Sequence, residues 1–147
     1  MKTDRGFSLL ELLIVVAIIL IIATIAIPSL LRSRQAANES SAVANTRTLN
    51  TAEVTYLSGS GQNYGAISDL INAGLIDTRF NSGVSGYSFI ISNSGSNYTA
   101  TAYPTSVNSG RYGYYSLPDA VIRYDNASGA ANCTPCYPTG LSGQAVP

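Results

Sequence analysis

The chain has 147 residues, of which 46% are hydrophobic and 11% are charged, and its formal net charge is zero. This length suits one small domain beside a single membrane segment. The absence of a basic excess argues against nucleic-acid binding, and the absence of an acidic run argues against a disordered tail.

The most apolar stretch of the sequence lies near the N-terminus, over residues 7–28. Between Leu12 and Ile27 every residue except Thr24 is apolar. As a helix this run is about 24 Å long, which is nearly the thickness of the hydrocarbon layer of a bilayer. The stretch therefore predicts a membrane helix.

Glu11 is a carboxylate one turn inside this apolar segment. An unpaired charge at such a position costs roughly 2.5 kcal/mol or more, so the residue is a candidate functional site. The alternative is that Glu11 simply lies at the lipid headgroups. The preceding residues, MKTDRG, are short and polar, and no small-residue cleavage site follows Ile27, so an ordinary secretory signal is not expected.

The hexapeptide GFSLLE at residues 6–11, the long apolar run and Pro28 resemble the class III leader and N-terminal helix of type IV pilins and pseudopilins. The resemblance implies that residues 1–6 are a leader, which prepilin peptidase cuts between Gly6 and Phe7, and that the new amine of Phe7 is methylated. It matches Glu11 to the glutamate of the family and Pro28 to its helix-kinking proline.

The charges agree with this resemblance. After cleavage, Phe7 would carry an ammonium group in apolar surroundings, and Glu11 of a neighbouring subunit would be a suitable counter-charge that sets the register of assembly. Pro28 removes one backbone donor, so we expect a bend or local melting near Thr24, whose hydroxyl can bond a freed carbonyl.

After Pro28 the sequence changes to mainly small and polar residues. Residues 29–57 contain no glycine or proline, so the helix is expected to continue through them. A helix over residues 7–57 would be about 75 Å long, and a filament would bury the part that a small domain leaves exposed. The spacing predicts a narrow buried stripe on residues 29–57. It consists of Ala36, Ala37, Val43, Ala44, Asn50, Val54 and Leu57.

A turn over residues 58–63 and a short helix over residues 64–77 are predicted next. Ser68 or a residue just before it is expected to cap this helix, and Gly74 is expected to end it in a left-handed conformation. A similar tyrosine followed by Gly-Leu-Ile-Asp occurs in many pilins and pseudopilins.

Four short β-prone runs follow, at residues 87–91, 98–103, 112–116 and 121–124. They predict an antiparallel meander, with Pro104 and Pro118 at the ends of runs. The fold class is therefore α+β: a long N-terminal helix packed on a small antiparallel sheet in a domain over residues 58–125. We expect one face of the sheet to cover the helix and the other to expose Thr, Ser and Tyr.

The tail over residues 126–147 is rich in Gly, Ala, Ser and Pro and contains Cys133 and Cys136. In an exported domain this pair is expected to form a small disulfide. A metal site is not expected, because the chain has no histidine and no second cysteine pair. A redox site would require a helix N-terminus after a strand.

No catalytic residues and no cofactor are predicted, because the sequence has no histidine, P-loop, nucleophile elbow or paired carboxylates. The resemblance implies a structural subunit of a type IV pilus, in the role of the major pilin. The alternatives are a pseudopilin of a type II secretion system and a minor pilin that acts as an adhesin or in DNA uptake. Major pseudopilins resemble one another in an acidic calcium site near the C-terminus, and residues 125–147 offer no such cluster.

The expected partners are further copies of the same chain in a helical filament, prepilin peptidase, the inner-membrane assembly machinery and, before assembly, the membrane itself. No specific nucleic acid is expected. The charges do not decide the orientation of the membrane helix, because Lys2 and Arg5 precede it and Arg32 and Arg34 follow it. The resemblance implies that the N-terminus of the precursor lies in the cytoplasm, with the precursor in the inner membrane and the processed chain in an extracellular filament.

Overall fold

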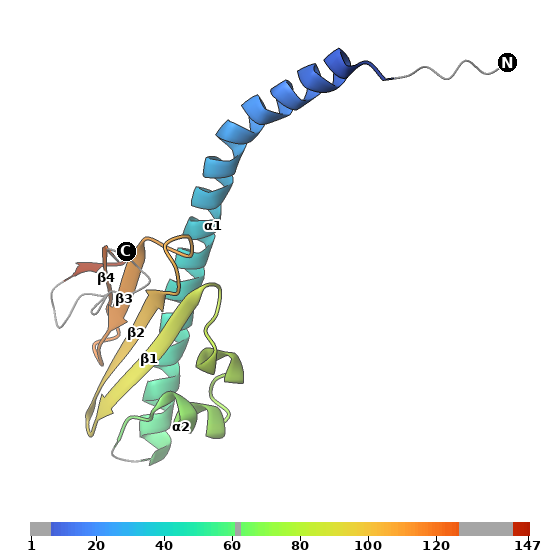
Figure 1. Cartoon of the computed structure of the whole chain (residues 1–147). Helices are drawn as coiled ribbons and strands as arrows, with labels where there is room; N and C mark the ends of the chain where they lie inside the picture. Colours follow the sequence, from blue (N-terminus) through green and yellow to red (C-terminus); the bar gives the residue numbers. More distant parts are fainter. Residues whose placement is uncertain (1–6, 61–62, 127–142) are drawn as a thin grey trace. The chain divides into compact units, whose positions relative to one another are not determined.

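The secondary structure consists of one long helix, two short helices and five strands (Figure 1). The structure is a computed structural model that describes residues 7–60, 63–126 and 143–147. The elements are α1 (Leu9–Ser60), α2 (Ile67–Asn72), the 3₁₀ helix η1 (Thr78–Asn81), β1 (Tyr87–Ser94), β2 (Asn97–Pro104), β3 (Tyr112–Ser116), β4 (Ile122–Asn126) and β5 (Gln144–Ala145). This order confirms the predicted α+β class.

The chain divides into two compact units, residues 1–33 and residues 34–147. We call them the N-terminal unit and the C-terminal unit. Helix α1 contributes its first part to the N-terminal unit and the rest to the C-terminal unit. Each unit is described by itself below.

Helix α1 ends at Ser60, three residues later than the predicted boundary near Leu57. Its second part is rich in Ser and Thr, which ordinarily compete with helical hydrogen bonding. Here the hydroxyl groups donate to the carbonyl four residues earlier, as in the bonds from Thr46 to Ala42 and from Thr55 to Thr51. These side chains are therefore satisfied without leaving the helix.

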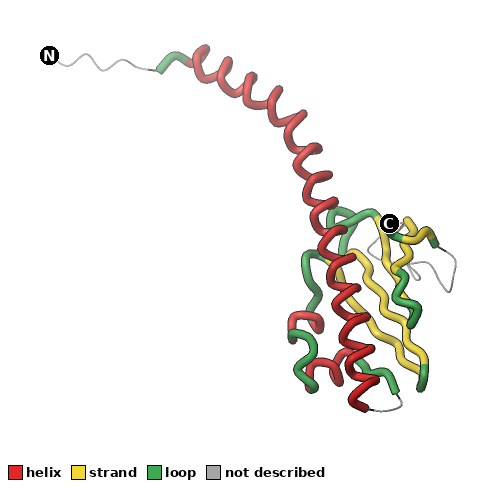
Figure 2. The backbone as a smooth tube through the Cα atoms, turned by 180° about the vertical axis from the view of Figure 1, so that it is seen from behind, coloured by secondary structure: helices red, strands yellow, loops and turns green. Residues whose placement is uncertain are grey.

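The five strands form one antiparallel sheet in the order β1-β2-β3-β4-β5, as the predicted meander requires. Strands β1 and β2 pair from Tyr87 opposite Pro104 to Ser94 opposite Asn97. Strand β5 was not predicted, because its two residues lie in a tail whose composition indicates a loop. In the C-terminal unit, α1 lies along one face of this sheet (Figures 1 and 2).

The core of the C-terminal unit lies between α1 and the inner face of the sheet. Alternate residues of β1 and β2 point inward, and the fully buried ones include Tyr87, Ala100 and Ala102. Leu49 of α1 and Leu70 of α2 are also fully buried. Small residues on β2 leave room for the helix, and the larger aromatic residues surround them.

The buried stripe predicted on α1 was largely wrong. Of its seven members, Asn50 is buried, Val43 and Leu57 are half-buried, and Ala36, Ala37, Ala44 and Val54 are exposed. The face that meets the sheet instead carries Glu39, Ala42, Thr46, Leu49, Asn50, Ala52 and Glu53. The prediction failed because it assumed an apolar contact face, whereas polar residues with hydrogen-bond partners occupy more than half of it.

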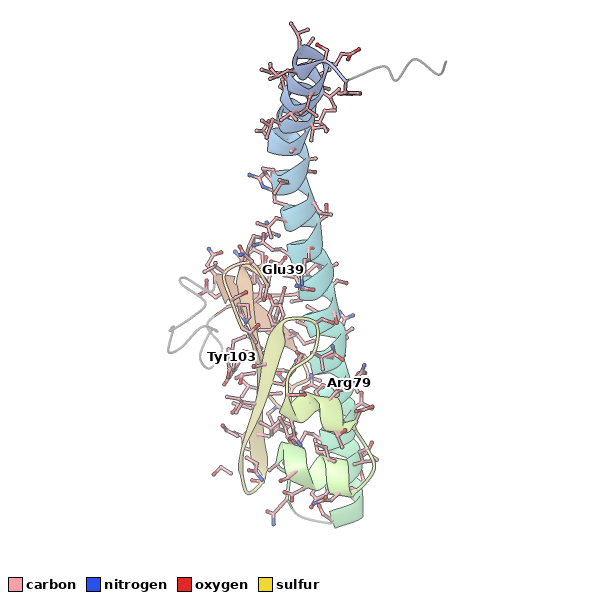
Figure 3. All side chains as sticks on the ribbon, turned by 45° about the vertical axis from the view of Figure 1, so that its right-hand side comes forward. Glu39, Arg79 and Tyr103 are labelled. Atoms are coloured by element: carbon pink, nitrogen blue, oxygen red, sulfur yellow. The ribbon has the colours of Figure 1, made fainter. Side chains whose placement is uncertain are left out.

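The outer face of the sheet was expected to expose its Thr, Ser and Tyr residues. Half-exposed Tyr103 on β2 follows this expectation (Figure 3), but Thr101 and Tyr115 are buried. Thr101 and Tyr115 face each other across β2 and β3, and the Thr101 hydroxyl donates to the Ile90 carbonyl. Cross-strand neighbours of this size shield one another from water.

Helix α2 is shorter than predicted, because the sequence up to Asp77 includes a turn and only residues 67–72 are helical. Its N-cap is Ala66, which is one of the residues just before Ser68, and the Ala66 amide donates to the Asp69 carboxylate. Gly74 has a φ of 70°, as predicted. The amides of Gly74 and Leu75 donate to the carbonyls of Ile71 and Leu70, which is a Schellman termination.

The turn before β4 contains no glycine, and Ala120 takes its place. Ala120 has a φ of 57°, and its amide donates to the Leu117 carbonyl. The Asp119 carboxylate accepts from the Val121 amide and binds Arg123. These side-chain bonds hold a left-handed residue that would otherwise favour glycine.

We predict opposite effects on stability for two glycine substitutions, one just after α2 and one inside α1. An added Cβ meets nothing within 4 Å at either Gly74 or Gly59, but Gly74 has a positive φ and Gly59 lies in α1. Gly74→Ala should lower the free energy of unfolding by about 1 kcal/mol, whereas Gly59→Ala should raise it by up to about 1 kcal/mol. Thermal unfolding of the full chain in detergent measures both, and equal effects would contradict the backbone argument.

Candidate assembly site

The first part of α1 presents a long apolar surface, in which Glu11 and Thr24 are the polar residues between Leu9 and Pro28. Its large side chains from Leu9 to Leu30 are exposed, with Ile25 at 74%. The helix is long and apolar enough to cross a membrane, and its most apolar window of 18 residues has a mean hydropathy of 3.1 with no buried residue. These properties fit the predicted transmembrane helix.

A capping box begins α1. The Ser8 hydroxyl accepts a hydrogen bond from the Leu10 amide at 3.3 Å, and Glu11 Oε2 accepts one from the Ser8 amide at 3.0 Å. This reciprocal arrangement satisfies two backbone donors at the helix N-terminus. The expected partner of Glu11 was the Phe7 amine of a neighbouring subunit, and this contact within the chain was not predicted, although the spacing Ser-x-x-Glu is its ordinary signal.

Pro28 lies inside α1, which is helical on both sides of it. The Thr24 hydroxyl donates to the Ile21 carbonyl at 2.7 Å. The expected local melting is therefore not found, and the bend at Pro28 stays a prediction.

Three of the predicted site residues lie outside the described residues: Gly6, Cys133 and Cys136. Phe7, on the other side of the expected cleavage bond, is 75% exposed. Cleavage and methylation at this bond, and the disulfide, stay predictions.

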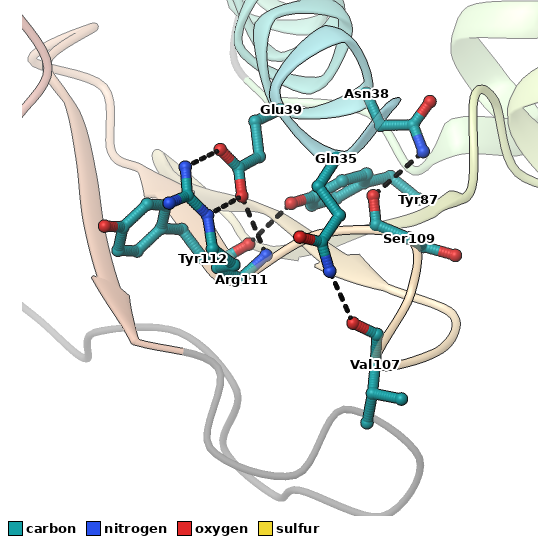
Figure 4. A network of polar contacts seen from close by, with 8 residues as sticks. All are labelled: Gln35, Asn38, Glu39, Tyr87, Val107, Ser109, Arg111 and Tyr112. Carbon is teal, nitrogen blue, oxygen red and sulfur yellow. Dashed lines mark hydrogen bonds and ion pairs between the residues drawn. The ribbon is translucent and has the colours of Figure 1, made fainter. Parts of the chain in front are cut away.

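In the C-terminal unit, the loop between β2 and β3 is attached to α1 by side chains of the helix (Figure 4). Gln35 Nε2 donates to the Val107 carbonyl and Asn38 Nδ2 donates to the Ser109 carbonyl, each at 2.9 Å. Both acceptors are backbone groups. The attachment therefore depends on the path of the loop and on two amide side chains of the helix.

Glu39 of α1 makes three hydrogen bonds to Arg111, the residue just before β3 (Figure 4). Figure 3 also labels Glu39. Its carboxylate accepts from the Arg111 amide at 2.8 Å, from Arg111 Nε at 3.1 Å and from a terminal guanidinium nitrogen at 2.9 Å. The Glu39 side chain is 9% exposed, whereas that of Arg111 is 56% exposed. The hydrogen bonds and the charge of Glu39 raise the pKa of Arg111. The pair is charge-assisted and bidentate, and these are the geometries that contribute most.

Tyrosines surround this ion pair. The Tyr87 hydroxyl donates to the Tyr112 carbonyl at 2.8 Å. Burial raises the pKa of Tyr87, with Tyr114 and Glu39 adding to the shift and Arg111 opposing it. Burial likewise raises the pKa of Tyr114. Both phenols therefore remain neutral hydrogen-bonding groups at physiological pH.

Two more buried polar residues of α1 have partners outside the helix. Asn50 Nδ2 donates to the Ser116 hydroxyl at 2.8 Å, and Asn50 Oδ1 accepts from the Tyr98 hydroxyl at 3.1 Å. Glu53 Oε2 accepts from the Gly65 amide at 3.0 Å. Sequence analysis missed Glu39 and Glu53, although both share one helix face with Thr46, which is a weak signal for buried polar contacts.

No group of three or more His, Cys, Asp or Glu side chains that could hold a metal occurs among the residues that the structure describes. The arrangement offers a capped helix with an exposed apolar surface and a sheet fixed to its second part.

Comparison with known proteins agrees with this arrangement. A family model described as the prokaryotic N-terminal methylation motif matches residues 1–27. The type IV major pilin protein PilA of Myxococcus xanthus is 46% identical over 55 residues, which are 37% of this chain and 25% of PilA. The type IV wide pilus major component PilA4 of Thermus thermophilus is 54% identical over 39 residues, which are 26% of this chain and 30% of PilA4.

The chain thus spans a quarter to a third of the length of these relatives, and no solved structure matches it significantly. The matched class is that of proteins with a prokaryotic N-terminal methylation motif. Within this class the relatives are type IV pilins, which confirms the resemblance to the type IV pilin and pseudopilin family.

We predict that Arg111→Ala destabilises the C-terminal unit. After the substitution, the buried carboxylate of Glu39 keeps only the hydrogen bond from the amide of residue 111. We expect the free energy of unfolding to fall by about 1–3 kcal/mol. The lower end of this range applies, because the Arg111 side chain is half-exposed. Thermal unfolding of the full chain in detergent measures the loss. Arg123→Ala is the matched control and should cost less, because the carboxylate that it leaves unpaired, that of Asp119, is 38% exposed and can bind water. An equal loss in both variants would contradict a special role of Glu39.

Proposed function

We propose that this protein is the major structural subunit of a type IV pilus filament. The observation that carries the proposal is the exposed apolar first part of α1, which begins inside a methylation motif and whose N-terminus is capped by Glu11. The two pilin relatives support the same role. The role is structural, because the sequence lacks the residue patterns of catalysis and the relatives are named as filament components.

The proposed sequence of events begins in the inner membrane. The precursor lies there with its N-terminus in the cytoplasm, and prepilin peptidase cuts the bond between Gly6 and Phe7 and methylates Phe7. Assembly machinery then moves the chain from lipid into a filament of identical subunits. Copies of the apolar part of α1 replace lipid around one another, so the apolar surface stays out of water throughout.

Glu11 has two oxygens for two tasks. Oε2 holds the Ser8 amide of its own chain, and Oε1 accepts no hydrogen bond from any residue that the structure describes. In the filament, Oε1 would face the methylated amine of Phe7 on a neighbouring subunit. The capping box would hold the carboxylate in place before this ion pair forms, which lowers the cost of ordering it.

The second part of α1 supports packing between subunits as well. Ala36, Ala37, Ala44 and Val54, which the sheet leaves exposed, lie on this part of the helix. Small side chains allow close approach of another helix. We assign this surface to contacts with further copies of the chain.

The test of the proposal is mass spectrometry of protein sheared from the cell surface, which gives the N-terminus and the abundance together. We expect an abundant chain that begins at N-methylated Phe7. A chain cut at Phe7 but confined to the cell envelope would instead indicate a pseudopilin, and a rare processed chain would indicate a minor pilin.

Gly6→Val is the matched control for processing. A branched side chain before the cut should leave full-length precursor in the membrane and no sheared protein. Normal cutting of this variant would remove the leader assignment.

Two substitutions at Glu11 separate its two tasks. Glu11→Ala removes both the cap and the charge, whereas Glu11→Gln keeps an acceptor for the Ser8 amide and removes the charge alone. If the charge sets the register, both variants should be processed and retained in the membrane but should yield at least about tenfold less sheared filament, which corresponds to about 1.4 kcal/mol of assembly free energy. Normal filaments from Glu11→Gln would show that the cap, and not the ion pair, is what assembly requires.

A further inference from the structure

Glu53 is a buried carboxyl group with no cationic partner among the described residues. It lies on α1 two turns before the helix ends, and its side chain is fully buried. Oε2 accepts from the Gly65 amide at 3.0 Å, while Oε1 is buried without a hydrogen-bond partner in the described part of the chain. A buried group that is half-satisfied in this way is costly when it is ionised.

The bond from Gly65 is the attachment of α1 to residues 63–66, which lead into α2. The same segment is held at the other side by the hairpin of β1 and β2. There the Tyr64 amide donates to the Gly95 carbonyl at 3.3 Å, and Asn93 Nδ2 donates to the Tyr64 carbonyl at 2.9 Å. Residues 63–66 are therefore bonded to α1 through Glu53 and to the hairpin through Gly95 and Asn93. We call this segment with its bond to Glu53 the latch.

The titratable groups that face Glu53 do not stabilise its charge. Asp69 on α2 carries a like charge, and Tyr98 on β2 is neutral with its hydroxyl donated to Asn50. The two ion pairs of the described residues, Glu39 with Arg111 and Asp119 with Arg123, lie elsewhere. Burial raises the pKa of Glu53, the Gly65 amide opposes the shift, and Asp69 adds to it.

We propose that Glu53 is a proton-controlled latch for residues 63–66. With the carboxyl protonated, the latch is closed and Gly65 stays bonded to α1. Ionisation puts an uncompensated charge in the core beside Asp69, and the segment opens to let water reach the carboxylate. This inference concerns the C-terminal unit and does not depend on the filament role.

The sign of the effect follows from linkage. The closed form binds the proton more tightly than the open form, because the pKa is raised in the closed form. Closure is therefore fully favoured below the ordinary pKa of a glutamate, weakens as pH rises from there, and reaches a constant lower level above the raised pKa. Within this window the opening equilibrium should change by up to about tenfold per pH unit.

The experiment is amide hydrogen exchange of the full chain in detergent micelles at a series of pH values, corrected for intrinsic exchange rates. In the wild-type chain, the protection of the Gly65 amide, which donates to Glu53, should fall across the window, whereas that of the Leu49 amide in the middle of α1 should not. In Glu53→Gln, which keeps an acceptor for the Gly65 amide without a charge, protection should be independent of pH. The same pH profile in Glu53→Gln as in the wild type would overturn the proposal.

Glu39→Gln is the matched control, because it neutralises the other buried glutamate of α1, whose charge Arg111 already compensates. It should keep the wild-type pH profile at Gly65. A second measurement covers the case in which Glu53→Gln does not fold: the ¹³C shift of the Glu53 carboxyl in the wild-type chain should titrate above the ordinary glutamate range. Titration within the ordinary range would overturn the proposal by itself.

Discussion

Buried polar side chains on α1 constrain how the sheet can lie against it. Within the described residues, all buried positions of α1 fall between Glu39 and Glu53, and about half of them are polar. An unpaired polar group in such a place costs about 1–3 kcal/mol. Each of these side chains must therefore meet a partner, and Arg111, Ser116 and Gly65 are placed where it can. A sliding of the helix by one turn would break all three contacts together, so these polar groups fix the register of the helix along with the packing of its buried apolar residues.

One helix thus serves two environments. Its first part has a mostly apolar surface and a capped N-terminus, which suits lipid or the interior of an assembly, where the backbone must satisfy its own hydrogen bonds. Its second part uses specific polar contacts, which work beside water and allow a small domain with few large aliphatic residues to hold a single arrangement. Gln35, the first residue of α1 that bonds to a loop of the C-terminal unit, follows shortly after the apolar segment ends.

Much of this fold was accessible from the sequence, because strong local signals encode it. The length of the apolar run, the alternating β-prone runs and the position of Gly74 predicted the helix, the meander and the left-handed termination of α2. The contact face of α1 was not predicted, since helical spacing alone does not tell which of two mixed faces meets a sheet. Glu39 and Glu53 look like surface residues until their partners 72 and 12 residues away are known. The left-handed conformation of Ala120 could not be predicted either, because the bonds of Asp119 to the Val121 amide and to Arg123 replace the glycine that such a turn ordinarily has. For Glu11, the sequence is compatible both with a cap inside the chain and with an ion pair to another subunit, so the sequence alone does not reveal the bond to the Ser8 amide.

The loop between β2 and β3 has a consequence for how the surface of this protein can change. Gln35 and Asn38 bond to backbone carbonyls of Val107 and Ser109, and the side chain of Val107 is 60% exposed. A carbonyl is present whatever residue carries it. Substitutions at Val107 that preserve the backbone path leave this anchor intact, so charge, size or hydrophobicity can vary there while the loop stays fastened to the helix. In this loop, the exposed side chain of Val107 can therefore change while the backbone carbonyls keep the loop bonded to α1.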